Sequence, residues 1–365
     1  MLKKVRQTFL FLLLGFNLLV GVGLLMGAYG QYFSPISFPY FSIAGLAFPI
    51  FFFLNLLCMV AWLVLKKRFA LLSLALLALS GDSLLTYFPL GSTTKSAGGS
   101  VLKVLTYNVE SMPSQTDEKG RSVNPILEYI KKSGADIVCV QEWPLANEQI
   151  INDLKSTYPY MKVVPLKSEV GVTCLSKYKI LSSENIEVES PGNGAGIFYI
   201  KYGRKKLPLI IAHLESNKLN DEDKKFYESI LSDPKHNIRP GDSKHLLGKL
   251  KNAAVLRASQ ADVLAQKIKD VNDPFMLVCG DFNDVSLSYA RRVIAENLQD
   301  VYRKSSFGPG ITYHEHYMFF RIDHILAGKG YRVLKSKIDR SIDTSDHYPY
   351  WCELEIPEDT SNLNN

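Results

Sequence analysis

The feature that most constrains this chain is the stretch from Gln7 to Leu65, which contains no Asp, Glu, Lys, Arg or His. It is far longer than the roughly 18–20 apolar residues that mark one membrane helix. A water-soluble helical bundle is disfavoured because the stretch has no polar face to meet water. Polar breaks, with Pro35 and Pro39, divide it. We predict three membrane spans in an anchor of residues 1–90, at about 8–29, 41–65 and 69–88.

The distribution of positive charge predicts the orientation of the anchor. Lys3, Lys4 and Arg6 precede the first predicted span, and residues 66–68 (KKR) lie between the second and third. The positive-inside rule then places the N-terminus and this basic turn in the cytoplasm, and everything after the third span outside. We therefore expect a multi-pass protein of the cell inner membrane, with the lipid bilayer as its partner. A cleaved signal peptide is the alternative, but the apolar stretch is longer than the roughly 7–15 residues of a signal peptide's hydrophobic region.

The formal charge of +6 belongs mostly to the anchor. Six of the 42 basic residues and one of the 36 acidic residues lie in residues 1–90, which leaves 36 basic and 35 acidic residues elsewhere. A nearly neutral remainder gives no electrostatic argument for nucleic-acid binding.

The five cysteines show no metal-binding or disulfide pattern. Cys58 lies in a predicted span, and the others lie in or beside apolar runs without CxxC spacing. We expect small buried hydrophobic residues with free thiols and no zinc site.

A second region follows the anchor. Residues 91–100, rich in Gly and Ser, are predicted to be a flexible linker to a soluble domain at 101–356, with a disordered tail at 357–365. Apolar runs of strand length alternate there with polar segments, and residues 124–133 and 253–269 show helical patterns. Such alternation suggests sheets covered by helices. Periodicity alone also allows a doubly wound parallel sheet.

The most informative motif in this domain is residues 280–284 (GDFND), which follow the apolar run 275–279. The pattern predicts a buried strand with Asp281 and Asn283 pointing the same way, because side chains alternate along a strand. This pair suits chemistry on a phosphate: the carboxylate can accept a proton from water, and the amide can donate to a phosphoryl oxygen. Alone, the motif is also typical of an ordinary strand followed by a turn.

Four other stretches carry polar residues at the ends of apolar runs: 101–110 with Asn108, 137–143 with Glu142, 209–215 with His213, and 345–349 with Asp346 and His347. With residues 280–284, their order and spacing resemble the endonuclease/exonuclease/phosphatase superfamily of DNase I-like phosphoesterases, here in a membrane-anchored bacterial form. The resemblance covers the whole soluble domain. It implies a four-layer α/β sandwich, in which two packed mixed sheets, mostly antiparallel, are flanked by helices.

The resemblance also implies a metal site. Glu142 is the expected ligand of Mg²⁺ or Mn²⁺, Asn108 helps to position metal and phosphate, and Asp346 is able to bind metal. An oxygen-only site of this kind suits these hard cations.

The same resemblance assigns roles in one-step hydrolysis. Asp281 activates water for in-line attack, while Asn283, His213 and His347 stabilise the charge that develops on phosphorus. Asp323 is expected to hydrogen-bond the catalytic histidine and fix its tautomer. Three further residues are expected to support the site: Arg257 and Gln260 from a helix, and Glu169 as an acid paired with His213.

Three functions follow from these observations. The first is a membrane-tethered phosphodiesterase or phosphatase that acts on a lipid headgroup or a small phosphorylated metabolite. The second is a nuclease of the same fold, acting on DNA or RNA outside the cytoplasm. The third is an inactive binding module, which is disfavoured because every expected polar position is filled. No protein partner is implied.

Overall fold

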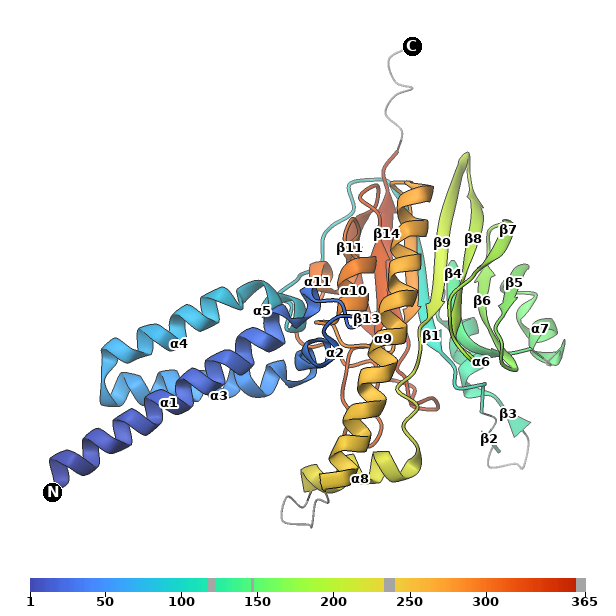
Figure 1. Cartoon of the computed structure of the whole chain (residues 1–365). Helices are drawn as coiled ribbons and strands as arrows, with labels where there is room; N and C mark the ends of the chain where they lie inside the picture. Colours follow the sequence, from blue (N-terminus) through green and yellow to red (C-terminus); the bar gives the residue numbers. More distant parts are fainter. Residues whose placement is uncertain (114, 117–121, 146–147, 233–239, 359–365) are drawn as a thin grey trace.

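The structure, a computed structural model, describes residues 1–113, 115–116, 122–145, 148–232 and 240–358. A bundle of apolar helices projects from one side of a domain built on two sheets (Figure 1). Most of the tail predicted at 357–365 lies outside the described residues.

The bundle consists of α1 (Leu2–Tyr29), α3 (Ala44–Leu65), and a bent pair made of α4 (Lys67–Leu79) and α5 (Gly81–Tyr87). Short elements η1 (Gly30–Tyr32) and α2 (Pro39–Ser42) connect the first two long helices. Among the described residues, two helices are long and apolar enough to cross a membrane, and the bent pair makes a third if it is one span.

The third predicted span is broken. The helices α4 and α5 meet at a bend of 59°. At the break, the Ser80 hydroxyl donates to the carbonyl oxygens of Leu76 (3.0 Å) and Leu77 (3.1 Å). A serine that bonds back to the preceding turn, followed by a glycine, is a recognised cause of helix bending.

The first sheet has the strand order β13-β14-β1-β4-β6-β5. Its strands are β1 (Ser100–Asn108), β4 (Ile137–Pro144), β5 (Tyr160–Pro165), β6 (Val170–Ser176), β13 (Arg332–Ile338) and β14 (Tyr350–Ile356). The pair β1–β4 is parallel, and the other neighbours are antiparallel.

The second sheet has the order β11-β12-β10-β9-β8-β7. Its strands are β7 (Ile180–Ile186), β8 (Gly194–Tyr202), β9 (Lys205–His213), β10 (Leu277–Asp281), β11 (Gln299–Asp300) and β12 (Asp323–Ala327). Again one central pair, β9–β10, is parallel. A small hairpin of β2 (Gln115–Thr116) and β3 (Ser122–Val123) stands apart.

Helices cover the outer faces of both sheets. On the first sheet, α6 (Pro125–Lys132) and α7 (Glu148–Leu154) bury their apolar sides, and α9 (Pro240–Val271) and α10 (Tyr289–Ile294) do so on the second. The remaining helices are α8 (Asp221–Ser232) and α11 (Val301–Ser305). The two mixed sheets with helices outside confirm the predicted four-layer sandwich.

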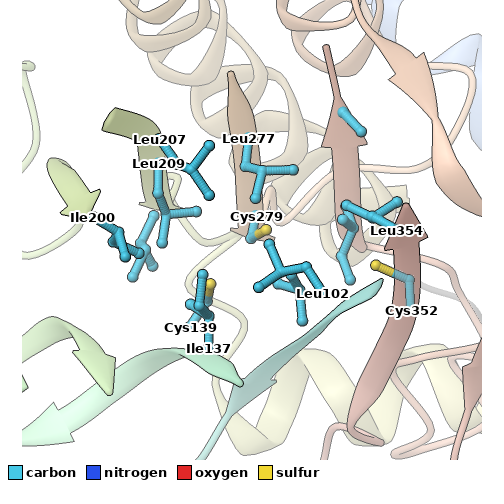
Figure 2. Close-up of a cluster of buried hydrophobic side chains, with 14 of the residues drawn as sticks. Leu102, Ile137, Cys139, Ile200, Leu207, Leu209, Leu277, Cys279, Cys352 and Leu354 are labelled. Carbon is cyan, nitrogen blue, oxygen red and sulfur yellow. The ribbon is translucent and has the colours of Figure 1, made fainter. Parts of the chain in front are cut away.

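The core between the sheets is apolar and contains the cysteines. Side chains such as Leu102, Leu209, Leu277 and Leu354 meet there, with Cys139, Cys279 and Cys352 among them (Figure 2). All five cysteines are free and buried, as expected. Burial raises the pKa of the Cys139 and Cys352 thiols, so they behave as small hydrophobic residues.

The predicted linker is held against the domain. The backbone N–H groups of Ala97 (2.7 Å) and Gly99 (2.9 Å) donate to Glu355 Oε1, and that of Thr94 donates to the Leu334 carbonyl (2.7 Å). These contacts differ from the expected flexible tether, because the Glu355 carboxylate accepts from two backbone N–H groups of a Gly-rich segment that offers little steric obstacle.

Direct packing also joins the bundle to the domain. Leu287, between β10 and α10, lies in one apolar cluster with Leu24, Ala28, Phe48 and Leu76 of the bundle. A Cβ atom at Gly45 would come within 2.5 Å of the Leu287 carbonyl oxygen, so the close approach of α3 requires glycine there. The helical bundle and the sandwich therefore form one packed body.

Candidate active site

The four central strands bring polar residues from distant parts of the chain to one edge of the sandwich. Asn108 ends β1 beside Gln141 of β4, and Asp281 ends β10 beside His213 of β9. Because parallel strands finish at the same edge and the two sheets pack face to face, these strand ends meet. The sequence-predicted residues Asn108, Glu142, His213 and Asp281 line one pocket.

Antiparallel strands deliver the remaining residues to the same edge. Asp323 begins β12 and lies opposite Asp281 in the register, and His347 lies just before β14, which runs antiparallel to β1. The Ser345 hydroxyl donates to the Asn108 carbonyl oxygen (2.8 Å) and accepts from the His347 backbone N–H (3.2 Å). This serine therefore fixes the segment 345–347 against the end of β1.

One oxygen of Asp281 is the centre of the site. Its Oδ2 atom accepts a hydrogen bond from Asn108 Nδ2 (3.1 Å) and lies 3.7 Å from the Nε2 atoms of both His213 and His347. Asp281 is only 1% exposed. Burial raises the pKa of this carboxyl group, and the neighbouring His347 opposes that rise. A buried carboxylate of this kind is well placed to accept a proton.

His347 is oriented by a second carboxylate. Its Nδ1 lies 2.7 Å from Asp323 Oδ2, which fixes the ring with Nε2 toward Asp281. Burial lowers the pKa of His347, but Asp323 and Asp281 reverse this and hold the pKa well above its usual range. The ring can thus carry a positive charge that faces the pocket.

Glu142 has an unusual backbone. Its φ is +56°, and the pairing of β4 with β6 shifts register between Val140 and Trp143. A non-glycine residue in the left-handed region is uncommon, and a bulge of this kind redirects a side chain. Glu142 Oε1 accepts from Asn108 Nδ2 (3.1 Å) and lies 3.6 Å from His213 Nε2. The irregularity aims the carboxylate into the pocket.

Asn283 lines the pocket, but it arrives there by a different route from the one predicted. The strand β10 ends at Asp281, and Asn283 lies in the following turn with a φ of +52°. Its backbone N–H donates to Asp281 Oδ1 (2.7 Å), and its Nδ2 donates to the Leu214 carbonyl (2.9 Å). Strand alternation therefore does not explain its position.

Arg257 and Gln260 of α9 hold the segment that follows His213. Arg257 donates to the carbonyl oxygen of Glu215 (3.0 Å) and to Asp284 Oδ2 (3.0 Å). The Oε1 atom of Gln260 accepts from the Glu215 backbone N–H (2.9 Å). Both side chains thus hold the chain next to His213, and Arg257 also lines the pocket; their supporting role in the site stays a prediction.

Glu169 does not fill its predicted place. It lies just before β6 with its side chain exposed, and its backbone carbonyl accepts a hydrogen bond from the N–H of Leu145, which follows β4. Among the described residues, the carboxylates within 4 Å of His213 Nε2 are those of Glu142 and Asp281. The correction follows from the fold, because the parallel neighbour β10 and the facing sheet bring acids closer than β6 does.

The donor set of the site fits a hard divalent cation. Carboxylates of Glu142, Asp281 and Asp346 line one pocket, and burial raises the pKa of Asp346, with Glu142 adding to the effect. Such like charges favour a cation between them. Ligand atoms of Asp281, Asp323 and His347 also lie within 4.8 Å of one another. Asp323 Oδ2 is bonded to His347, but Asp323 Oδ1 is buried without a hydrogen-bond partner, so both this oxygen and the carboxylates on the side of Glu142 are open to a cation.

The pocket has a volume of about 650 Å³ and extends well beyond these residues. The sequence reasoning missed Tyr313, whose ring meets that of His347 edge-on with centroids 5.2 Å apart. It also missed the apolar wall formed by residues such as Ile50 and Leu246. Tyr313 lies in irregular chain without periodicity, and Ile50 has the pattern of an ordinary membrane helix, so neither carried a signal.

The family comparison agrees with this geometry. The model described as "Endonuclease/Exonuclease/phosphatase family" matches residues 105–347, which is more than half of the chain. The chain belongs to this family, whose members are hydrolases of phosphoester bonds that generally use divalent metals. A second model, of a domain of unknown function, matches residues 8–87. No curated protein sequence matches the chain.

Solved structures are similar to it at low identity. A family member from Bacteroides vulgatus is 18% identical with a TM-score of 0.48, and covers 71% of this chain and all of its own. The human Nocturnin catalytic domain with bound sulfate is 16% identical with a TM-score of 0.49, and the match covers 70% of this chain and 94% of the Nocturnin domain. Sphingomyelinase C from Streptomyces griseocarneus is 17% identical with a TM-score of 0.46, and the match covers 70% of this chain and 99% of the sphingomyelinase.

Proposed function

We propose that this chain is a membrane-tethered phosphodiesterase that depends on Mg²⁺ or Mn²⁺ and hydrolyses its substrate in one step. The observation that carries the proposal is the buried Asp281 carboxylate, which Asn108, His213 and His347 surround at 3.1–3.7 Å. A proton acceptor flanked by two imidazoles and an amide matches the needs of in-line attack on a phosphate.

Each residue has a defined task in this proposal. Asp281 takes the proton of a water molecule while the water oxygen bonds to phosphorus and the bond to the leaving oxygen breaks. His213 and His347 donate through Nε2 to the phosphate or to the leaving oxygen. His347 can do so because Asp323, bonded at Nδ1, stabilises the protonated ring, in which both nitrogens carry a proton. A divalent cation bound by Glu142, with Asn108 and Asp346, supplies positive charge beside the phosphate.

A metal-removal experiment tests the chemistry. The full chain, purified in detergent, is assayed with bis(p-nitrophenyl) phosphate before and after treatment with EDTA. We expect EDTA to abolish hydrolysis and Mg²⁺ or Mn²⁺ to restore it. Undiminished rates in EDTA would overturn the metal assignment, and no hydrolysis under any condition would favour the inactive binding module.

The substrate is proposed to be a phosphoester at the membrane in preference to nucleic acid. The domain is packed against the anchor and carries 36 basic and 35 acidic residues outside it, so it lacks the positive excess that drives non-specific binding to nucleic acids. We expect faster turnover of sphingomyelin or phosphoinositides than of plasmid DNA or single-stranded RNA in parallel assays. Rapid, salt-sensitive nicking of plasmid would favour the nuclease instead.

The catalytic domain is proposed to lie outside the cytoplasm. Lys3, Lys4 and Arg6 lie at the start of α1, and the basic residues 66–68 lie where α3 gives way to α4. The start of α1 and the junction of α3 with α4 lie at the same end of the bundle, the end away from the sandwich (Figure 1). The positive-inside rule supports an outward-facing domain.

A further inference from the structure

The pocket that begins at Asp281 continues from the sandwich onto the membrane anchor. Leu46, Ala47 and Ile50 of α3 line it together with Leu246 and Leu250 of α9. The polar groups of the candidate site and these aliphatic side chains divide the lining of this cavity between them. A cavity with this division suits an amphiphilic molecule.

The apolar wall is continuous with the surface of α3 along the bundle. Leu46, Ile50, Phe53, Leu57 and Val64 recur at helical spacing and so share one face of the helix. The side chains from Ile50 onward are between 61% and 81% exposed. All five are apolar, so a hydrocarbon chain that follows this face meets no polar side chain.

Exposed aromatic residues lie at the end of the bundle where α1 ends and α3 begins. Tyr29, the last residue of α1, and Tyr32, Phe38 and Tyr40, which lie between α1 and α3, are 42–63% exposed. Tyrosine is enriched where a membrane protein crosses the membrane–water interface. The first turns of α3, which line the pocket, follow directly after them in the chain. The mouth of the pocket therefore lies next to the expected bilayer surface.

We propose that the first turns of α3, together with α9, form a subsite for the hydrocarbon chain of a membrane amphiphile whose phosphoester lies at Asp281. The anchor is then part of the substrate-binding site as well as a tether. This inference rests on the proposed phosphodiesterase function and narrows its substrate to esters that carry a long alkyl chain. Nucleic acids and small phosphorylated metabolites have no hydrocarbon chain that could pack against this apolar wall.

Two synthetic diesters test the subsite. The full chain in nanodiscs of dioleoylphosphatidylcholine is assayed with p-nitrophenyl ethyl phosphate and p-nitrophenyl dodecyl phosphate, which differ only in alkyl length. Each buried methylene contributes about fourfold in affinity, so kcat/KM for the dodecyl ester exceeds that for the ethyl ester. The measured quantity is the ratio of these two kcat/KM values in each variant.

Matched variants separate the subsite from simple partitioning into the lipid. Leu246→Gln places an amide in the apolar wall, while Leu247→Gln changes its neighbour, which is 45% exposed and points elsewhere. Ala47→Phe fills the wall from α3, and Leu57→Phe alters the same helix face beyond the pocket. We expect Leu246→Gln and Ala47→Phe to lower the dodecyl-to-ethyl ratio by roughly tenfold. We expect the two control variants to keep the wild-type ratio, because they leave the pocket wall unchanged. Partitioning of the esters into the lipid is the same for every variant and so cannot account for a difference between them.

The outcomes distinguish the two levels of the proposal. If neither ester is hydrolysed by the wild type, the proposed function fails. If both are hydrolysed but all variants share one ratio, the subsite is wrong and the proposed function stands. A photoreactive diazirine at the end of the dodecyl chain gives an independent measurement with the inactive Asp281→Asn protein: crosslinks are expected at Leu246 and Leu250, outside the bundle, and their absence would contradict the subsite.

Discussion

Asp281 combines burial with exposure of one oxygen to the pocket. Its Oδ1 accepts from the Asn283 backbone N–H, while Oδ2 faces Asn108 and the two histidines. The backbone contact fixes the carboxylate plane, so the same oxygen always faces the pocket. Such preorganisation is where much of an enzyme's rate advantage arises.

Removing the charge of Asp281 should therefore stop the reaction without unfolding the protein. We expect Asp281→Asn to lower kcat by at least ~10²-fold, because a carboxamide cannot accept the proton. Glu142→Gln and His347→Ala should cause losses of similar size. The rates are measured with bis(p-nitrophenyl) phosphate and saturating Mg²⁺. Asp270→Asn, on the outer surface of α9, is the matched control, and a comparable loss there would argue against a specific role.

Gly280 permits the close contact of β9 with β10 that places Asp281 beside His213. Its φ is +140°, and a Cβ atom there would lie 1.9 Å from the Ala212 carbonyl oxygen. We expect Gly280→Ala to destabilise the protein by at least about 1–3 kcal/mol, the usual cost of such backbone strain. Thermal unfolding in detergent measures this. Gly248→Ala, which meets nothing within 4 Å inside α9, should be neutral or stabilising.

The identities of the site residues were predictable, but their conformations were not. Asn108, His213 and Asp281 close apolar runs, and that pattern is visible in sequence. The left-handed backbone of Glu142 and Asn283 depends on a register shift and on a turn that bonds to Leu214. These are tertiary effects, which local periodicity does not encode.

At the scale of elements, a buried charge cluster joins β11, α10 and the start of β12. Asp300 forms an ion pair with Arg291 and lies 3.3 Å from Arg321, whose guanidinium also donates to the Thr86 carbonyl of α5 (2.9 Å). Burial raises the pKa of Asp300, but the two arginines outweigh it and hold the pKa well below its usual range. This one carboxylate is therefore shared by two buried cations at the junction with the helical bundle.

This charge cluster makes the free energy of unfolding depend on pH. Because the folded pKa of Asp300 is depressed, its contribution is present above the unfolded pKa of about 3.9 and is lost as pH falls below it. We expect Asp300→Asn to cost about 3–5 kcal/mol at neutral pH, since it leaves buried charge unpaired. Melting temperature measured between pH 7 and 2.5 should then fall less steeply in the variant than in wild type. Parallel curves would contradict the assignment, and Asp343→Asn, at an exposed site, serves as control.

Element boundaries show which signals the sequence carries. The helix α6 was predictable because Asn124 caps it, accepting from the Leu127 N–H (3.0 Å), and Pro125 occupies its first turn. The extension of α9 back to Pro240 was not, because its first turns contain Gly241 and Gly248 and little periodic apolar pattern. Those turns are part of the pocket region, where packing against the rest of the molecule decides the structure.

At the scale of the whole molecule, the anchor and the sandwich are one unit. Arg303 bonds Asp82 (2.6 Å) and Thr86 (3.0 Å), and Arg292 donates to the Gln31 carbonyl (2.9 Å). The sequence predicted two regions with a flexible linker between them, because the apolar and polar segments separate clearly. The sequence carries no sign that α3 would line the pocket of the candidate site, since lipid-facing and protein-facing apolar residues look alike in sequence.

The last prediction concerns the orientation of the protein in the membrane. Because the bundle packs against the sandwich, this orientation also decides the side of the membrane on which the candidate site lies. The sandwich meets the bundle where α1 ends and α3 begins, opposite the basic residues 66–68. Alkaline phosphatase, which is active only outside the cytoplasm, should be active when fused after Ser100 and silent when fused after Lys67. Green fluorescent protein, which fluoresces only inside, should give the reverse pattern at the same two positions. If both reporters show the opposite result, the domain faces the cytoplasm, and the expected substrate is an amphiphile of the inner leaflet.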